Sequence, residues 1–359
     1  MNRLSPPRTS APCLALCCLL FSCAPDAKKP DVTPKVPRPP ATDAATGSAS
    51  DSATIRLGTW NIEHFGSRSK FQNRPDSPPD RTPAELAKVA EFIKQMQTDV
   101  LALQEIDSPA ILHQLLQHLG DDYRFTLGTT GVYGKTRISV GFLWNRQRVQ
   151  LLHCEEMSEF PSKVGDLTVF HRKPVNAAFR AIHPDGRPGF DFRAITVHLK
   201  ASKGAKNERK RSTEAKVLSE YLRKLAQDPE EDHDIVVLGD FNHTYGAPAC
   251  IEFTSNDLVE YVRPANNGAM APTIVWFDEP IDHIALTKGI REDVQANSHR
   301  VHNQRVDWKL KEDALTASKA LWRQTYSDHF PVSIELRSGT DLDPNAKFSS
   351  AGKPLQIGK

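Results

Sequence analysis

The sequence predicts an α+β fold with enough strands for more than one sheet. Two observations support this. Runs of β-branched and aliphatic residues recur along the chain and stop at polar residues, as strands do at the edge of a sheet. Between these runs, apolar residues recur at helical spacing in three stretches. With 359 residues, 39% of them apolar, the chain can bury a full core, and we expect one large domain with appendages.

Residues 1–22 are typical of an export signal rather than of folded structure. Arg3 and Arg8 precede a short apolar stretch, residues 11–21, which is too short to span a bilayer as a permanent helix. The residues that end at Cys23 resemble a bacterial lipobox, so we expect Cys23 to be the lipidated first residue of a lipoprotein in the cell envelope. An ordinary cleaved signal peptide is the alternative, and both alternatives predict export.

The remaining chain divides by composition into three parts. Residues 23–52 are dense in Pro, Ala and Ser with hardly an aliphatic residue, which predicts a flexible tether. Residues 53–337 carry all the periodic segments and are expected to form the folded domain. Residues 338–359 are again polar, and the composition predicts a loose tail.

Within the domain, each expected element has its own signal. Thr82-Pro83-Ala84-Glu85 has the form of a capping box with Pro at the first helical position, so a helix should begin there. Ser108-Pro109 opens a second helix that Gly120 ends, and apolar spacing predicts a third helix over residues 212–226. Strands are predicted over residues 137–144, 175–182, 192–198 and 234–238.

Net charge and cysteine content say little about which molecules the protein binds or whether it forms a disulfide. The net charge of +2 neither favours nor excludes a polyanionic partner. Outside the signal segment only Cys154 and Cys250 remain, and they can form a disulfide or stay as buried free thiols. No Cys or His spacing typical of a structural zinc site is present.

The most informative segment follows the apolar run 235–238. Gly239-Asp240-Phe241-Asn242 places a carboxylate and a carboxamide at the end of a buried strand. Because side chains alternate along a strand, Asp240 and Asn242 can face one cleft while Phe241 turns into the core. This pair suits metal-assisted attack on a phosphate group.

Five other segments repeat the pattern of a β-rich run that ends in polar residues. They are Asn61-Ile62-Glu63, Gln104-Glu105, Val197-His198, Ile281-Asp282-His283 and Ser327-Asp328-His329. Taken in this order, the segments resemble the endonuclease/exonuclease/phosphatase superfamily, which includes deoxyribonuclease I, abasic-site endonucleases, neutral sphingomyelinases and inositol-polyphosphate phosphatases. The resemblance covers residues 53–337 and implies a four-layer α/β/β/α sandwich like that of deoxyribonuclease I, with the active site at one rim.

The resemblance also implies a metal site. Glu105 matches the principal metal-binding Glu of the family, Asn61 matches the family Asn, and Asp328 matches an acid implicated in metal binding. Glu63 is an additional candidate ligand, because abasic-site endonucleases carry an acid at that place. Oxygen ligands of this kind suit Mg²⁺, with Mn²⁺ or Ca²⁺ as alternatives.

The catalytic residues implied by the resemblance form a second set. His198 and His329 match the two active-site histidines of the family. Asp240 and Asn242 match the pair that orients the nucleophilic water and contacts phosphate. Asp282 matches the acid that accepts a ring proton from the second histidine and so orients it.

Phosphate binding is expected from Arg172 together with Asn242 and His198. Arg172 lies where nucleases of this group place a phosphate-contacting Arg. The chain departs from deoxyribonuclease I at Thr136, where that enzyme has a Glu that supports the first histidine. Since a neutral hydroxyl cannot hold an imidazolium as a carboxylate does, the detailed mechanism of that enzyme is not transferred.

The segment 200–211, directly after His198, contains six basic residues and one acid. Lys and Arg contacts to phosphates supply most sequence-independent affinity for nucleic acid, so the segment favours a monomeric, non-specific DNA or RNA endonuclease. A phospholipid hydrolase like sphingomyelinase, or an inositol-phosphate hydrolase, is the alternative, and a non-catalytic surface binding protein is a third. No aromatic residues interleave with the basic ones to stack unpaired bases.

Overall fold

The computed structural model describes residues 53–71, 79–133, 136–186, 188–264, 270–338, 346–350 and 352–359. The expected signal peptide, Cys23 and the tether lie outside these residues. Among the described helices, none has the length and apolar content that crossing a membrane requires.

The first of two large sheets has seven strands. They are β1 (Ala53–Phe65), β2 (Val100–Ile106), β3 (Tyr123–Leu127), β6 (Ser139–Asn145), β15 (Arg300–Val301), β16 (Val332–Ser338) and β18 (Ile357–Gly358). Their order is β15-β16-β1-β2-β6-β3-β18. β1 is parallel to β2 and antiparallel to β16. The carboxyl ends of β1 and β2 and the beginning of β16 therefore share one edge.

The second sheet has the same number of strands. They are β7 (Val149–Glu156), β10 (Val175–Ile182), β11 (Pro188–His198), β12 (Ile235–Asp240), β13 (Val259–Tyr261), β14 (Asp282–Thr287) and β17 (Lys353–Pro354). Their order is β13-β14-β12-β11-β10-β7-β17. β12 is parallel to β11 and antiparallel to β14, so this sheet too collects two strand ends and one strand start at one edge. Two short hairpins complete the strands: β4 (Val132–Tyr133) with β5 (Thr136–Arg137), and β8 (Lys163–Val164) with β9 (Leu167–Thr168).

The two sheets pack face to face through a buried apolar core. Phe142 of the first sheet meets Phe179 of the second edge to face, with ring centroids 5.7 Å apart. Both belong to one cluster with Ile55, Val236 and Leu238, all fully or almost fully buried. Period-two alternation on each strand supplies these inward residues and sends the next ones to the helices.

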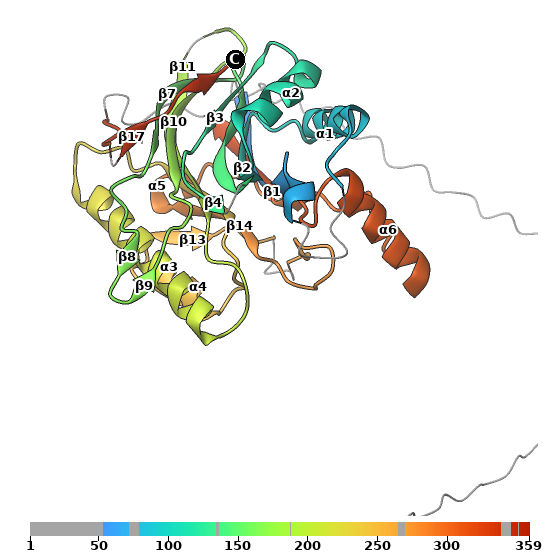
Figure 1. Ribbon diagram of the computed structural model, residues 1–359. Helices are drawn as coiled ribbons and strands as arrows, with labels where there is room; N and C mark the ends of the chain where they lie inside the picture. The colour runs from blue at the N-terminus through green and yellow to red at the C-terminus, as the bar shows by residue number, and fades with distance from the viewer. Residues whose placement is uncertain are drawn as a thin grey trace, which may run out of the picture. The chain divides into compact units, whose positions relative to one another are not determined.

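Helices cover the outer faces of both sheets (Figure 1). The described helices are α1 (Pro83–Met96), α2 (Pro109–Leu119), α3 (Ala205–Gln227), α4 (Pro248–Thr254), α5 (Lys288–Arg291), α6 (Glu312–Thr325) and the 3₁₀ turn η1 (Arg68–Phe71). The short helix α5 differs from the outer helices, since its Ile290 joins the core between the sheets. α1, α2 and α6 contribute to the cluster outside the first sheet, and α3 and α4 to the cluster outside the second. The expected four-layer α/β/β/α sandwich is confirmed.

The helix starts agree with the sequence signals except at α3. The capping box is formed, since Thr82 Oγ1 accepts a hydrogen bond from the amide of Glu85 and the carboxylate of Glu85 accepts one from the amide of Thr82. α3 begins at Ala205 and not at residue 212. Ala205 is the only apolar residue of its first turns, and Arg211 is buried there instead, so hydrophobic periodicity cannot reveal them.

The expected loose tail is wrong for the described residues 346–350 and 352–359. β17 pairs with β7 and β18 pairs with β3, so the segment adds an edge strand to each sheet. These pairings use main-chain groups, which a polar composition does not prevent. The cysteine alternatives are also resolved, because Cys154 and Cys250 are both buried and free.

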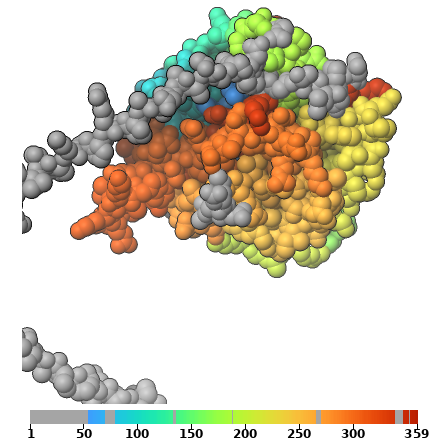
Figure 2. All heavy atoms as spheres, turned by 180° about the vertical axis from the view of Figure 1, so that it is seen from behind, coloured from blue at the N-terminus to red at the C-terminus, as the bar shows by residue number. Residues whose placement is uncertain are grey.

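The connection from β14 to β16 leads from the second sheet to the first. It carries α5, β15 and α6. Residues of this part of the chain, drawn in orange, occupy the middle of the face seen in Figure 2. The connection returns to the sheets at residues 327–331, which enter the active-site edge.

Candidate active site

Strand register in the second sheet places three predicted residues side by side. His198 pairs with Asp240, and Asp240 pairs with Asp282, in adjacent strands. Paired residues of neighbouring strands point to the same face, so the three side chains form a row across β11, β12 and β14. Gly239 allows this close pairing: its φ is +151° and an added Cβ would lie 2.0 Å from the carbonyl oxygen of Val197.

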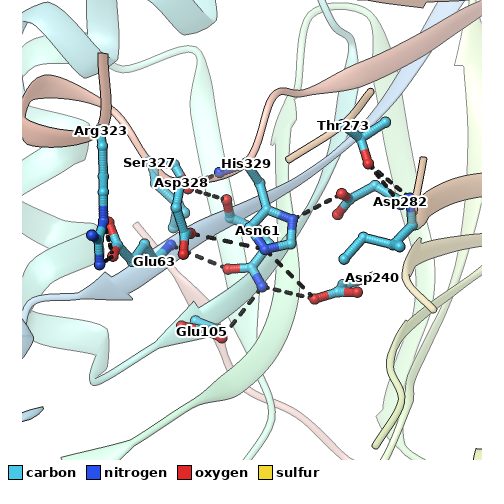
Figure 3. A network of polar contacts seen from close by, with 12 residues as sticks. Asn61, Glu63, Glu105, Asp240, Thr273, Asp282, Arg323, Ser327, Asp328 and His329 are labelled. Carbon is cyan, nitrogen blue, oxygen red and sulfur yellow. Dashed lines mark hydrogen bonds and ion pairs between the residues drawn. The ribbon is translucent and has the colours of Figure 1, made fainter. Parts of the chain in front are cut away.

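Asn61 connects this row to the first sheet. Its Nδ2 donates to Asp240 Oδ2 at 3.0 Å and lies 3.3 Å from Glu105 Oε1 (Figure 3). Asn61 is the last residue of β1 before its register with β2 shifts, and Glu105 lies near the end of β2 with a left-handed φ of +64°. The carboxyl ends of parallel strands thus deliver a carboxamide and two carboxylates to one place.

His329 and Asp282 form the second link between the sheets. His329 Nδ1 lies 2.8 Å from Asp282 Oδ2, and Asp282 is fully buried. Burial lowers the pKa of His329, but the hydrogen bond and charge of Asp282, with the charges of Asp328 and Asp240, outweigh burial and raise this pKa well above its usual range. The pair is suited to holding a proton at His329.

Asp240 lies at the centre of the polar contacts of the site. Its Oδ1 accepts the main-chain amide of Asn242 at 2.9 Å, and its Oδ2 accepts Asn61. His198 Nε2 lies 3.4 Å and His329 Nε2 4.0 Å from the same Oδ2. Both carboxylate oxygens are therefore held in fixed positions between two imidazoles.

Burial also tunes Asp240. Burial and the neighbouring charge of Asp282 raise the pKa of Asp240 to about 7, against the lowering effect of His329. Phe241 turns into the core as predicted and is fully buried. Asn242 departs from a strand at a left-handed φ of +52°, and its carboxamide donates to the carbonyl of Leu199 at 3.2 Å.

Arg172 holds the end of β11. Its Nε and Nη2 donate to the carbonyl oxygens of His198 and Leu199, at 3.0 and 2.8 Å. Only 9% of Arg172 is exposed. These contacts position His198. The contact between Arg172 and a substrate phosphate, expected from the sequence, stays a prediction.

His198 itself is buried. Burial and the charge of Arg172 lower the pKa of His198 well below its usual range, so the ring is neutral. Its Nδ1 has no hydrogen-bond partner among the described residues. A supporting carboxylate of the deoxyribonuclease I kind is thus absent from the described part of the chain, in keeping with Thr136 at that position.

Glu105 and Asp328 lie on the open side of the site. Their side chains are 17% and 19% exposed. Burial raises the pKa of Glu105, but the imidazoles of His64, His198 and His329 outweigh it and lower this pKa to about 2. Burial and the charges of neighbouring acids raise the pKa of Asp328 to about 7.

The donor chemistry here fits a hard divalent cation. Glu105 and Asp328 offer carboxylate oxygens and Asn61 an amide oxygen, which are the ligands such cations prefer. A cation would also favour the ionised form of Asp328, whose carboxyl group resists ionisation. A second grouping has ligand atoms that all lie within 4.8 Å of one another, namely Asp240, Asp282 and His329. The buried Asp282 oxygen already bonds His329, so we favour the first set, which a phosphate can reach.

Glu63 lies in a cluster of arginine side chains. Its Oε2 accepts from Arg68 Nη2 at 3.0 Å, and its Oε1 accepts from Arg323 Nε at 2.8 Å. All three side chains are buried. Both oxygens contact guanidinium groups, so Glu63 belongs to this arginine cluster, and its additional role as a metal ligand stays a prediction.

Sequence reasoning missed His64 and Arg323. His64 Nδ1 lies 3.2 Å from Glu105 Oε2, and its main-chain amide donates to the same oxygen at 3.0 Å. Its position beside Glu63 in a strand-end motif was an available signal. Arg323 comes from α6, far along the chain, and no local pattern links it to Glu63.

In the folded protein, acidic residues from other segments partly balance the positive charge of the basic segment 200–211. Lys203 lies 3.5 Å from Glu279, and Arg209 lies 3.8 Å from Asp166, so acids from other segments approach it. Arg211 is buried. Exposed cations remain at the start of α3, namely Lys203, Lys206 and Arg209.

Comparisons with known proteins agree with this geometry. The model of the endonuclease/exonuclease/phosphatase family matches residues 58–329. No curated protein matches the sequence. The members of this family are phosphoesterases that generally depend on divalent metal ions.

Solved structures share the fold. An endonuclease/exonuclease/phosphatase family protein of Bacteroides thetaiotaomicron gives a TM-score of 0.52 at 18% identity, over 81% of this chain and 99% of that one. A mannosyl-6-phosphatase of Bacteroides thetaiotaomicron gives 0.50 at 19% identity, over 79% and 99%. A humanized D. rerio TDP2 gives 0.50 at 15% identity, over 79% and 98%. The family match spans most of the domain, and the chain belongs to the endonuclease/exonuclease/phosphatase family.

Proposed function

We propose that this protein is a divalent-metal-dependent phosphodiesterase, and more specifically an endonuclease that acts on DNA or RNA. The observation that carries the proposal is the fixed position of Asp240. Asn61 and Asn242 hold its two oxygens, and the His329–Asp282 pair lies 4.0 Å away. A base and a proton donor thus lie next to each other.

Asp240 would act on the attacking water. A carboxylate can accept a proton from water only when that water lies within hydrogen-bond reach, and the two amide donors fix where the carboxylate points. A pKa of about 7 places Asp240 near the ideal for a general base at neutral pH.

His329 lies beside Asp240 and would act on the same phosphate group. Its Nδ1 is bonded to Asp282, so its Nε2 is the atom that faces the site, 3.8 Å from Asp328. In the protonated form, Nε2–H stabilises charge on the phosphate oxygens or donates its proton to the leaving oxygen. Asp282 keeps the ring oriented and favours the protonated form.

Glu105, Asp328 and Asn61 would hold the cation, which we expect to be Mg²⁺, with Mn²⁺ or Ca²⁺ as alternatives. A bound divalent ion neutralises charge on the non-bridging oxygens of the substrate. His198 is neutral, and its Nε2 can donate to a phosphate oxygen next to Asp240. Arg172 supports His198 through the main chain of β11.

The nuclease assignment depends on the exposed cations of α3. Three exposed cations follow His198 in the sequence, namely Lys203, Lys206 and Arg209. They form a cationic border that suits a polyanion longer than one phosphate group. The test is turnover of a substrate panel by the full chain with Mg²⁺. Cleavage of plasmid or oligonucleotide, with little turnover of sphingomyelin vesicles or inositol phosphates, supports the proposal. Faster turnover of sphingomyelin vesicles or inositol phosphates than of nucleic acid would reject the nuclease proposal. It would leave the phosphodiesterase proposal standing.

We also propose that the protein is an exported lipoprotein anchored through Cys23. The support is the short apolar stretch before Cys23 and the polar tether after it. Labelled palmitate should enter the wild type in a bacterial host and should not enter Cys23→Ser. Labelling of both, or of neither, rejects the anchor.

A further inference from the structure

Residues 273–281 form a loop that is tied directly to the catalytic pair. The amide of Val275 donates to the carbonyl of Asp328 at 2.8 Å, and the amide of Phe330 donates to the carbonyl of Thr273 at 2.7 Å. Thr273 Oγ1 accepts the amide of Asp282 at 3.0 Å (Figure 3). The loop is therefore fixed against both the segment that carries His329 and the residue that orients it.

This loop exposes two adjacent aromatic side chains. Trp276 is 38% exposed and Phe277 is 55% exposed, while Thr273 and Val275 just before them are buried. One exposed aromatic residue on a protein surface is ordinary. Two in succession, on a loop that is hydrogen-bonded to the segments carrying His329 and Asp282, expose an apolar surface on a loop next to the catalytic pair.

A lysine from another segment of the chain meets this surface. Lys203 Nζ lies 5.5 Å from the centroid of the Phe277 ring, and 3.5 Å from Glu279 Oε1. Lys203 follows His198 in the chain, and Phe277 precedes Asp282. The aromatic pair and the cationic border of α3 thus meet at one rim, although they lie far apart in the sequence.

We propose that Trp276 and Phe277 form a stacking platform for an unpaired base of a single-stranded nucleic acid, whose phosphates contact Lys203, Lys206 and Arg209. The inference rests on the proposed nuclease function and names its substrate class. Aromatic side chains beside a cationic track bind single strands, because every base offers a π-face that a duplex keeps stacked. The sequence lacks aromatics within the basic segment, and the fold supplies them from another loop.

One feature favours a base within a nucleic acid over a single small ligand. A single sugar phosphate makes no use of cations that extend along α3. The platform is thus suited to a base within a longer polyanion.

The experiment uses the full chain with a fluorescent single-stranded oligothymidylate and with the same backbone made of abasic tetrahydrofuran units. Anisotropy in EDTA measures Kd for both, and Mg²⁺ turnover measures kcat/KM. Trp276→Ala and Phe277→Ala should each weaken binding of the oligothymidylate about 5- to 150-fold, the range that one stacked base supports. Binding of the abasic backbone should change less than about twofold, since it has no base to stack.

Matched variants guard against structural damage. Trp276→Phe keeps a ring and should retain most of the affinity, and Ile251→Ala removes an apolar side chain that is 60% exposed on α4 and should change nothing. Equal affinity of the wild type for the two backbones overturns the platform. So does an equal loss for both backbones in Trp276→Ala, or a loss that affects only binding to phosphatidylserine vesicles.

The two proposals fail in distinguishable ways. If the wild type hydrolyses bis-p-nitrophenyl phosphate but shows no preference for bases, the platform is rejected and the phosphodiesterase stands. If it binds the oligothymidylate through Trp276 but hydrolyses no diester, the platform stands and the catalytic proposal is rejected.

Discussion

The hydrogen bond between His329 and Asp282, at 2.8 Å, joins the two sheets of the sandwich at the active-site edge. His329 precedes β16 of the first sheet, and Asp282 begins β14 of the second. A shift of one sheet against the other would separate the two residues. The packed core between the sheets therefore fixes the geometry of the catalytic pair.

Asp282→Asn should lower kcat about 10²- to 10⁴-fold, the usual contribution of a positioned acid or base, with little change in KM. The amide keeps the shape of the side chain but removes the charge that holds the proton on His329. Steady-state kinetics with a phosphodiester substrate measure kcat and KM of the variant. The control is Asp166→Asn at an 80% exposed side chain. An Asp282→Asn enzyme within about twofold of the wild type would contradict the assigned role of the pair, which should contribute at least 10²-fold.

Glu63→Gln and Glu105→Gln should differ in kind. Glu63→Gln leaves Arg68 and Arg323 without their carboxylate, and removal of one partner from a buried ion pair costs about 3–5 kcal/mol of unfolding free energy. Glu105→Gln should instead raise the Mg²⁺ concentration for half-maximal activity at least about 10-fold. Urea unfolding and metal titration of both variants separate the two roles. A stable Glu63→Gln variant with weakened metal affinity would place Glu63 in the metal site.

Deletion of residues 346–359 should destabilise the domain. The deletion removes β17 and β18 and the partners of two buried acids, since Ser349 donates to Glu231 and Ser350 to Glu155. Each lost partner costs about 1–3 kcal/mol. Urea unfolding measures the loss, with deletion of Lys359 alone as the control. Equal stability of the two deletions would show that the segment is dispensable.

Acid should destabilise the protein partly through His302. Burial lowers the pKa of His302 to about 4, against 6.5 for an ordinary His. The unfolded chain then binds more protons than the native state between these values, so stability falls as the pH drops from 6.5 to about 4, by about 1.4 kcal/mol per pH unit. His302→Asn should remove this contribution. Urea unfolding at pH 7 and pH 5 should show a smaller pH effect in the variant, and an identical effect in both would contradict it.

Much of the fold was predictable because its signals are local. The capping box at Thr82 and the Pro109–Gly120 helix depend on neighbouring residues, and the structure has both. The strand ends that carry Asn61, Glu105, His198, Asp240 and Asp282 do meet at one edge, since parallel strands deliver their ends together.

What the sequence did not predict depends on contacts between distant segments. β17 and β18 form through main-chain pairing, and the start of α3 is completed by a buried Arg211 instead of an apolar residue. Glu63 carries the same carboxylate as Glu105, and only the arrival of Arg323 from α6 separates their roles. The aromatic rim likewise exists only once the loop of Trp276 meets Lys203.

The most direct test is hydrolysis of bis-p-nitrophenyl phosphate by the full chain over a series of Mg²⁺ concentrations, with EDTA and with His329→Ala. We expect saturable turnover that EDTA abolishes and that falls at least about 10²-fold in His329→Ala, while the variant unfolds at the same urea concentration as the wild type. Turnover that persists in EDTA, or an His329→Ala variant as active as the wild type, would contradict the assignment of this site as a metal-dependent phosphodiesterase centre.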